Sequence, residues 1–149
     1  VHRPTLDKFI RKYARKEKSS LAVLRVITGR RTFNPDDEDG AAYPFAVLKW
    51  KPTKMGKTGP SLDKEVLLRV IHESRNERDR QFARTLLDFR EAVVHLRRLR
   101  NDITKNLDSR SCVHAKFNTA AARTLRDSSN RPNFQNLAPE IRGAFMTRW

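Results

Sequence analysis

Apolar residues recur at helical spacing near the start of the chain. One face of the expected helix carries five of them: Leu6, Phe9, Ile10, Tyr13 and Ala14. This i, i+3, i+4, i+7, i+8 pattern predicts an amphipathic helix, and the positions off that face are basic. A second apolar set, Leu21, Leu24 and Ile27, predicts a further helical segment that ends near Gly29. Residues 5–30 are therefore expected to form a basic helical region.

A helix start is also expected shortly after this region. Asn34 can act as its N-cap, and Pro35 suits the first helical position. The acidic run 36–39 complements the positive end of the helix dipole, which explains these residues better than a cation site does. Gly40 and Pro44 interrupt the pattern, so the helix is expected to be short or broken.

Residues 51–60 have no hydrophobic periodicity and are predicted to form a basic loop. Ser61 follows as the expected N-cap of a helix that carries Leu62, Val66 and Val70. The loop and the helix start thus form one candidate region.

The strongest periodicity lies in the middle of the chain. Five apolar residues step by 4, 3, 4 and 3 positions: Phe82, Leu86, Phe89, Val93 and Leu96. This spacing predicts a long helix, from about 77 to 102, with one apolar seam and a strongly basic surface.

After Asn106 the period changes from helical spacing to two. Val113, Ala115 and Phe117 alternate with polar residues, which predicts a half-buried strand. The tail from 128 to 139 is polar and is expected to be irregular. The fold class is therefore mainly α with a small β part (α+β), with helices first and a short antiparallel β segment towards the end.

The charge balance points to a polyanionic partner. The chain holds 32 Lys and Arg against 17 Asp and Glu, a net charge of +15. Lys and Arg on phosphates release counterions, so nucleic acid is the first candidate. A membrane is a weaker one, because no apolar run approaches the roughly 18 residues of a spanning helix. The single Cys112 and the absence of an apolar signal region predict an intracellular, cytoplasmic protein.

Two familiar site motifs are incomplete. Gly56-Lys57-Thr58 lacks the glycine that a phosphate-binding P-loop needs five positions earlier, where Lys51 stands. The pair His72-Glu73 lacks the second histidine of a zinc-protease helix. We therefore expect no P-loop and no metal site in the chain.

A sharper interpretation comes from the C-terminal part. Residues 124–137 read TLRDSSNRPNFQNL, and residues 141–145 read IRGAF. These segments resemble the motifs T-G-R-L-S-S-x-x-P-N-L-Q-N-I and I-R-x-A-F of family-A DNA polymerases, the bacterial polymerase I type. Leu125 stands where the family has Gly, and Asp127 where it has Leu.

The resemblance continues upstream in family order and is closest to phage-type members. The thumb of these polymerases is similar to the segments 33–35, 48–54, 57–61 and 65–67, and its long helix to 87–91. Val113-His114 looks like the strand that follows. The resemblance implies a helical thumb region over 1–105 and the start of the palm over 106–149.

A set of DNA-binding residues is implied as well. In the thumb the expected phosphate contacts are Lys51, Lys54, Lys57, Thr58, Ser61 and Arg90. In the C-terminal motif the family arginine that reaches the minor groove at the primer terminus matches Arg126. The nearby expected contacts are Thr124, Ser128, Ser129, Asn133, Gln135 and Asn136.

The resemblance also implies the partner, the metal ion and the substrates of the full-length protein. Its partner is primer-template DNA, and the full-length enzyme uses Mg²⁺ and deoxynucleoside triphosphates. The first metal-binding aspartate of the family lies just beyond the I-R-x-A-F segment, so this chain alone is expected to be inactive, without a cofactor, and monomeric. It would work in the cytoplasm of a bacterial host if phage-encoded. A stand-alone basic helical nucleic-acid-binding protein and an inactive polymerase relic remain the alternatives.

Overall fold

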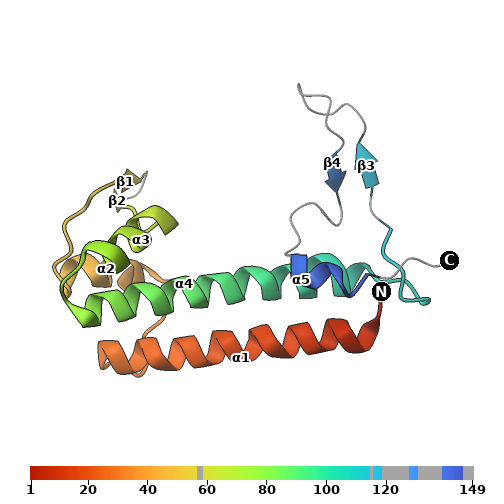
Figure 1. The fold of residues 1–149 in the computed structure, drawn as a ribbon, viewed down its shortest axis with the longest axis horizontal. Helices are drawn as coiled ribbons and strands as arrows, with labels where there is room; N and C mark the ends of the chain where they lie inside the picture. The colour runs from red at the N-terminus through yellow and green to blue at the C-terminus, as the bar shows by residue number, and fades with distance from the viewer. Residues whose placement is uncertain (57–58, 115, 119–127, 131–138, 146–149) are drawn as a thin grey trace. The chain divides into compact units, whose positions relative to one another are not determined.

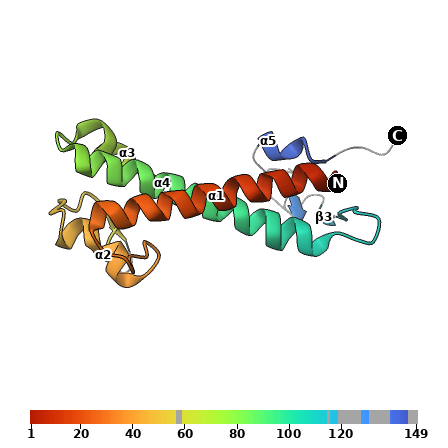
Figure 2. The same ribbon diagram turned by 90° about the horizontal axis from the view of Figure 1, so that it is seen from below.

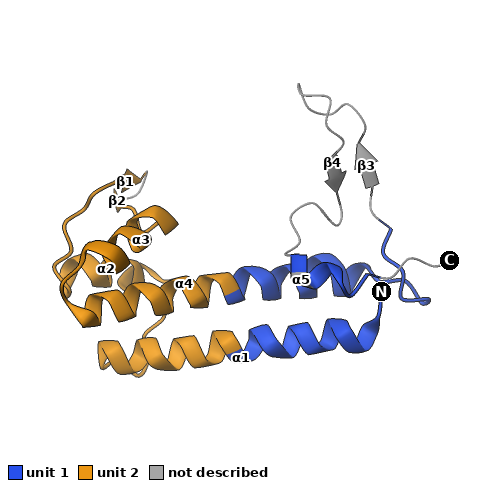
Figure 3. Ribbon diagram, viewed as in Figure 1, with its two compact units in different colours: residues 1–15, 92–149 blue, residues 16–91 orange. Residues whose placement is uncertain are grey.

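The computed structural model describes residues 1–56, 59–114, 116–118, 128–130 and 139–145. Helices dominate these residues, and two small antiparallel strand pairs complete them (Figure 1). The expected fold class, mainly α with a small β part, is confirmed. Two compact units are formed, one by Val1–Arg15 with Ala92–Trp149 and the other by Lys16–Glu91 (Figure 3). The expected thumb and palm regions, 1–105 and 106–149, stay a prediction.

The first helix, α1, runs without interruption from Arg3 to Thr28. The basic helix expected over residues 5–30 is therefore confirmed, as one continuous helix rather than two segments. The buried face continues through the polar stretch because Ser20, 7% exposed, stands seven residues after the buried Tyr13 and four before the buried Leu24. Gly29 ends the helix with a φ of 70°, a left-handed conformation that glycine adopts without a steric penalty.

The short helix α2, Glu38–Ala46, begins later than expected, and its N-cap is Asp37 rather than Asn34. The Asp37 carboxylate accepts a hydrogen bond from the Gly40 N–H at 2.7 Å. Asn34 instead accepts from the backbone of Asp36 at 3.2 Å and shapes the turn before the helix. Only glycine fits at position 40, because a Cβ atom there would lie 1.9 Å from the Asn34 carbonyl oxygen.

The region 51–60 is not a loop throughout. Strand β1, Met55–Gly56, pairs antiparallel with β2, Gly59–Pro60, in a small hairpin. Helix α3, Lys64–Glu73, follows, and in Figure 2 α2 and α3 appear on either side of the end of α1 within their unit.

The long helix is confirmed. Helix α4 runs from Glu77 to Arg97, and a π-helical segment, Arg98–Ile103, continues it. Most of the predicted seam is buried, at exposures of 0% for Phe82, 1% for Leu86 and 4% for both Phe89 and Leu96, whereas Val93 is half-buried. A regular stripe of 4 and 3 steps keeps one face of a helix inside, which is why its burial follows from the sequence.

Aromatic rings form the core of the Lys16–Glu91 unit. The Phe82 ring lies 5.6 Å from the ring of Tyr43, which is stacked on it, and 5.9 Å from Trp50, which meets it edge-on. Phe33 packs edge-on against Tyr43 at 5.5 Å. Such pairs add about 0.5–1.5 kcal/mol beyond the burial of their area, so this cluster holds α2 and α4 together.

The other unit has an aliphatic core in which segments far apart in sequence meet. It contains buried side chains from the start of α1, the end of α4, the π-helical segment and the short helix α5, Pro139–Arg142: Leu6, Tyr13, Ala92, Leu96, Leu99, Ile103 and Ile141. The backbone N–H of His2 donates to the Ala144 carbonyl at 2.8 Å. The start of α1 and the residues after α5 are therefore joined in one unit.

The small sheet of this unit differs from the prediction. Strand β3 begins at Lys116 and ends at Asn118, and it pairs antiparallel with β4, Ser128–Asn130. Residues 128–130 are thus a strand rather than irregular tail. Val113 forms an isolated bridge with Leu107 instead, because the turn between them brings their backbones together, and Ala115 lies outside the described residues.

Candidate nucleic-acid interface

The β1–β2 hairpin is fastened to the start of α3 through Lys54. Its ammonium nitrogen lies 2.5 Å from Asp63 Oδ2 and 3.3 Å from Glu65 Oε2. Its carbonyl oxygen accepts a hydrogen bond from the Ser61 N–H at 2.8 Å. Lys54 is therefore held by both its backbone and its side chain.

Asp63, not Ser61, caps α3, which corrects the predicted helix start. Asp63 Oδ1 accepts from the Val66 N–H at 3.0 Å, and Ser61 Oγ accepts from the Asp63 N–H at 3.3 Å. Both residue types are good N-caps, so the local sequence did not distinguish them. The first-turn N–H of Val66 is thus occupied by a carboxylate and is not open to a phosphate, which helix starts can otherwise bind.

At this junction Lys54 forms ion pairs with both Asp63 and Glu65. The hydrogen bond from Lys54 lowers the pKa of Asp63 below its ordinary value, and the backbone N–H of Val66 acts in the same direction. Hydrogen bonds to Asp63 and Glu65 raise the pKa of Lys54. Both shifts favour the charged forms of Lys54 and Asp63, and the charge of Lys54 is already compensated.

Arg90, on α4, is half-buried and reaches the segment before α3. Its Nη1 donates to the Leu62 carbonyl oxygen. Burial lowers the pKa of Arg90, and the negative charges of Asp36 and Asp63 act in the opposite direction. An arginine remains protonated in proteins, so this is a charged donor on a backbone oxygen. Its expected contact with DNA stays a prediction.

The remaining thumb residues of the predicted set divide in two. Lys51 is exposed just before the hairpin, and in the described part of the chain no ion pair involves it. Lys57 and Thr58 lie outside the described residues.

The C-terminal motif is only partly described. Ser128 and Ser129 lie in β4, where they pair with Asn118 and Phe117 of β3. Five predicted contacts fall outside the described residues: Thr124, Arg126, Asn133, Gln135 and Asn136. Their roles stay predictions.

A turn that the sequence analysis did not single out leads into this sheet. Asp108 Oδ1 accepts from the N–H groups of Arg110 and Cys112 at 2.9 and 2.7 Å, and Oδ2 lies 2.9 Å from His114 Nε2. The His114 contact, followed by the Cys112 N–H, lowers the pKa of Asp108 to about 2. The N-terminal ammonium of Val1 donates to the Ser111 carbonyl at 2.7 Å, which ties the turn to the start of the chain.

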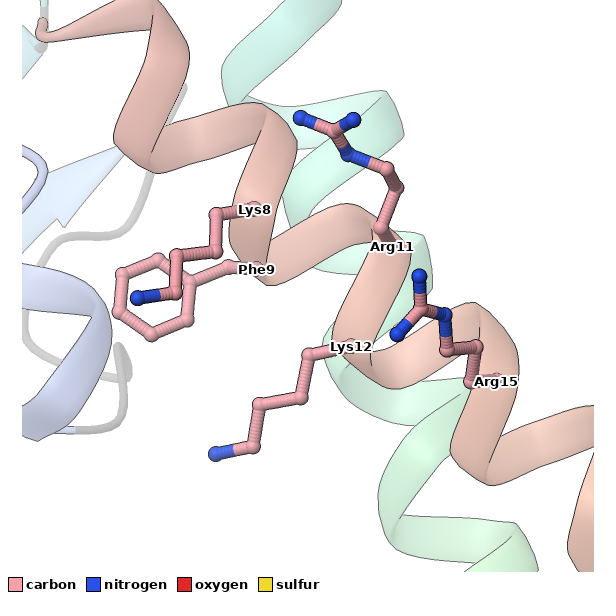
Figure 4. A pocket seen from close by; sticks show the side chains of 5 residues that line it. All are labelled: Lys8, Phe9, Arg11, Lys12 and Arg15. Atoms are coloured by element: carbon pink, nitrogen blue, oxygen red, sulfur yellow. The ribbon is translucent and has the colours of Figure 1, made fainter.

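A basic hollow on α1 was also missed as a site. Lys8, Phe9, Arg11, Lys12 and Arg15 line a space of about 410 Å³, and their side chains extend from the same helix (Figure 4). The cations had been noted only as residues off the apolar face. Their i, i+3, i+4 and i+7 spacing was the available signal, because it places them on one strip of the helix.

The described ranges contain neither a metal site nor a membrane-spanning helix. No group of three or more His, Cys, Asp or Glu side chains there could hold a metal ion. No helix within them is long and apolar enough to cross a membrane.

Comparison with known proteins gives a structural likeness. No family model and no curated protein matches the chain. Its fold, however, is similar to that of the POL domain of Pol1 from M. smegmatis, solved in complex with DNA primer-template and dNTP. The TM-score is 0.84 over 97% of this chain, at 24% sequence identity. The chain spans 26% of that solved chain. The fold is therefore polymerase-like.

Proposed function

We propose that the chain binds primer-template DNA as part of a template-directed DNA polymerase. The observation that carries this proposal is the fold, which follows the M. smegmatis POL domain over 97% of the chain at a TM-score of 0.84. The C-terminal motif supports it independently, because its residues resemble those of family-A polymerases in order and spacing. The net charge of +15 suits a phosphate-rich partner.

The thumb contacts are proposed to be to phosphates, since a polymerase must slide over any sequence and phosphate contacts position without specifying. Lys51, Lys57 and Thr58 carry these contacts. Lys54 and Arg90 are assigned a positioning role, because their polar groups are engaged by Asp63 and by the Leu62 carbonyl.

Arg126 is proposed to donate to the minor-groove edge at the primer terminus, assisted by the neighbouring polar residues of the motif. Minor-groove acceptors are nearly the same in all correct base pairs, so a donor there tests pair geometry without reading sequence. In a full-length enzyme, Arg126→Ala would lower the rate of nucleotide addition more than it weakens duplex binding, and Lys57→Ala would do the reverse. Pre-steady-state kinetics separate the two effects.

The parent protein is proposed to be a phage-type enzyme that acts in the cytoplasm and uses Mg²⁺ and deoxynucleoside triphosphates. Within it, this chain would supply the thumb and the start of the palm as a monomeric unit. Nucleotidyl transfer needs a pair of metal ions that stabilise the attacking and leaving oxygens. The chain contributes DNA binding rather than nucleotidyl transfer.

Fluorescence anisotropy with labelled primer-template duplexes tests the proposal. The dissociation constant should change little among duplexes of different sequence and should rise steeply with salt. Lys57→Ala should lower the slope of log K against log salt by about one unit, whereas Arg75→Ala, a matched exposed control, should not. Tight binding to one sequence, or an affinity independent of salt, would contradict the proposal.

A further inference from the structure

We propose that the hollow on α1 is a separate binding site for single-stranded nucleic acid. Lys8 and Arg15 would contact phosphates of one strand, and the ring of Phe9 would stack on an unpaired base. The site lies within one compact unit and uses none of the residues assigned to duplex binding.

Charge is the first argument. Lys8, Arg11, Lys12 and Arg15 are all exposed. Asp7 is the one acidic residue among the first sixteen positions of the sequence, and its backbone carbonyl accepts from Arg11 Nε at 3.3 Å. Lining cations without an acidic residue among them favour an anion.

A neighbouring lysine on the same helix shows the contrast. Lys16, one residue beyond the hollow, lies 2.9 Å from Asp88 Oδ1 and 2.5 Å from Glu91 Oε2. In the described part of the chain, no ion pair involves Lys8 or Arg15. The fold therefore neutralises the lysine next to the hollow and leaves these two cations available to a ligand.

Spacing is the second argument. Lys8 and Arg15 stand at i and i+7, so they lie on one strip of the helix, about 10 Å apart along its axis at 1.5 Å per residue. A single strand has a flexible backbone, so it can place one phosphate beside each of these two cations.

The aromatic ring of Phe9 favours a single strand over a duplex as the ligand of the hollow. Phe9 is half-buried, with one part packed on the unit's aliphatic core and another lining the hollow between the cations. Cations that follow the backbone, together with an aromatic ring for a base, are the elements of single-strand sites. In a duplex the bases are stacked on one another and their faces are not accessible to the Phe9 ring. The lining of the hollow therefore favours an unpaired strand.

The first experiment measures anisotropy of a labelled oligothymidine with the 149-residue chain. The double variant K8A/R15A should weaken binding about tenfold and reduce the salt slope by about 1.4, because each phosphate contact to a single strand contributes about 0.7. The control K64A/R75A removes the same charge from exposed positions and should change the affinity less than twofold. Equal losses in the two double variants would overturn the proposal.

The second experiment tests the ring. Phe9→Leu keeps the apolar contact with the core but removes the stacking surface, and should weaken binding about fivefold or more without changing the salt slope. Phe9→Tyr should retain binding. Equal thermal unfolding midpoints of the variants exclude misfolding as the cause. If Phe9→Leu unfolds at a lower temperature, the oligothymidine affinities of Phe9→Tyr and Phe9→Ile are compared instead, at a temperature where both are equally folded.

Two outcomes would assign the hollow to something else. If K8A/R15A weakens binding while removal of the ring has no effect, the strip is a general anion surface and the single-strand assignment fails. If vesicles with anionic lipid bind through these residues and oligothymidine does not, the partner is a membrane. Duplex affinity of the same variants should stay within twofold of the unsubstituted chain, so failure here and failure of the proposed duplex site are distinguishable.

Discussion

Two groups of cations in this chain are used in opposite ways. Around the start of α3, Lys54 lies between two carboxylates and Arg90 donates to a backbone carbonyl. On α1, Lys8 and Arg15 are exposed and line an open hollow. The sequence presents both groups simply as Lys and Arg in a chain of net charge +15. The positions of their partners determine which cations support the fold and which are available to a ligand.

The difference has a general consequence for reading basic proteins. A cation held by an acid in the fold releases few counterions when DNA approaches, because its charge is already compensated. The salt dependence of binding therefore reports the cations that are available rather than the net charge. Substitutions in the two groups should separate stability from binding.

The buried seam of α4 gives the largest effect. Phe89 precedes Arg90 on α4 and is only 4% exposed. Phe89→Ala should reduce the free energy of unfolding by about 3–5 kcal/mol, because it removes a buried ring and leaves a cavity. Arg15→Ala on the exposed face of α1 should change it by less than about 0.5 kcal/mol. Urea unfolding followed by circular dichroism measures both, and similar losses would mean that the two regions do not differ as described.

Arg90 itself should come second. Arg90→Met keeps much of the apolar stem but leaves the Leu62 carbonyl without its donor, which should cost about 1–3 kcal/mol in urea unfolding. Arg84→Met on the same helix is the control. Arg84 is exposed and lies 3.8 Å from Glu77, a surface pair that contributes about 0–1 kcal/mol. An Arg90 variant as stable as the control would contradict the positioning role.

Long helices were predictable from the sequence, whereas the junctions that orient the candidate site were not. The seam of Phe82, Leu86 and Phe89 is regular over several turns, and burial of one face follows directly. Helix starts were misplaced by two or three residues, because Asn34 and Ser61 are as good at capping as Asp37 and Asp63. Local propensity does not decide between such neighbours.

The partners of the cations could not be predicted from the sequence, for a different reason. Arg90 and the Leu62 carbonyl are 28 residues apart in the sequence, and no pattern in either segment predicts their hydrogen bond. The basic strip at Lys8 and Arg15 was visible as helical spacing. Only the structure separates it from the neutralised Lys16, whose acids lie on α4.

The third prediction concerns the pH dependence of the Lys54–Asp63 pair. The folded-state pKa of Asp63 is lowered, so this group stabilises the fold above its unfolded pKa, and that stability is lost as the pH falls through the lower folded value. Asp63→Asn retains a good N-cap and removes the charge. The urea midpoint of the variant should be lower at neutral pH, and the gap to the unsubstituted chain should narrow in acid. A gap that is constant with pH would exclude the ion pair as its cause.

The smallest effect is expected at the Asp108 turn. Its carboxylate should titrate near pH 2, because His114 and two backbone N–H groups favour the charged form. A depressed folded pKa means stability that is present above the ordinary value of 3.8 and is lost as the pH falls towards 2. Carbon-detected NMR titration should find this midpoint, and His114→Ala should move it upwards. An unchanged midpoint in the variant would remove His114 as the main cause.

The most direct test of the account compares Lys51 with Lys54 in duplex binding. Both lysines lie beside the same hairpin, but Lys54 is paired with Asp63 and Glu65 and Lys51 is exposed. The slope of log K against log salt for a primer-template duplex is measured for the unsubstituted chain, Lys51→Ala and Lys54→Ala. We expect a slope lower by about 0.9 for Lys51→Ala, the loss of one phosphate contact, and an unchanged slope for Lys54→Ala. Equal reductions in both variants, or a reduction in Lys54→Ala alone, would contradict it.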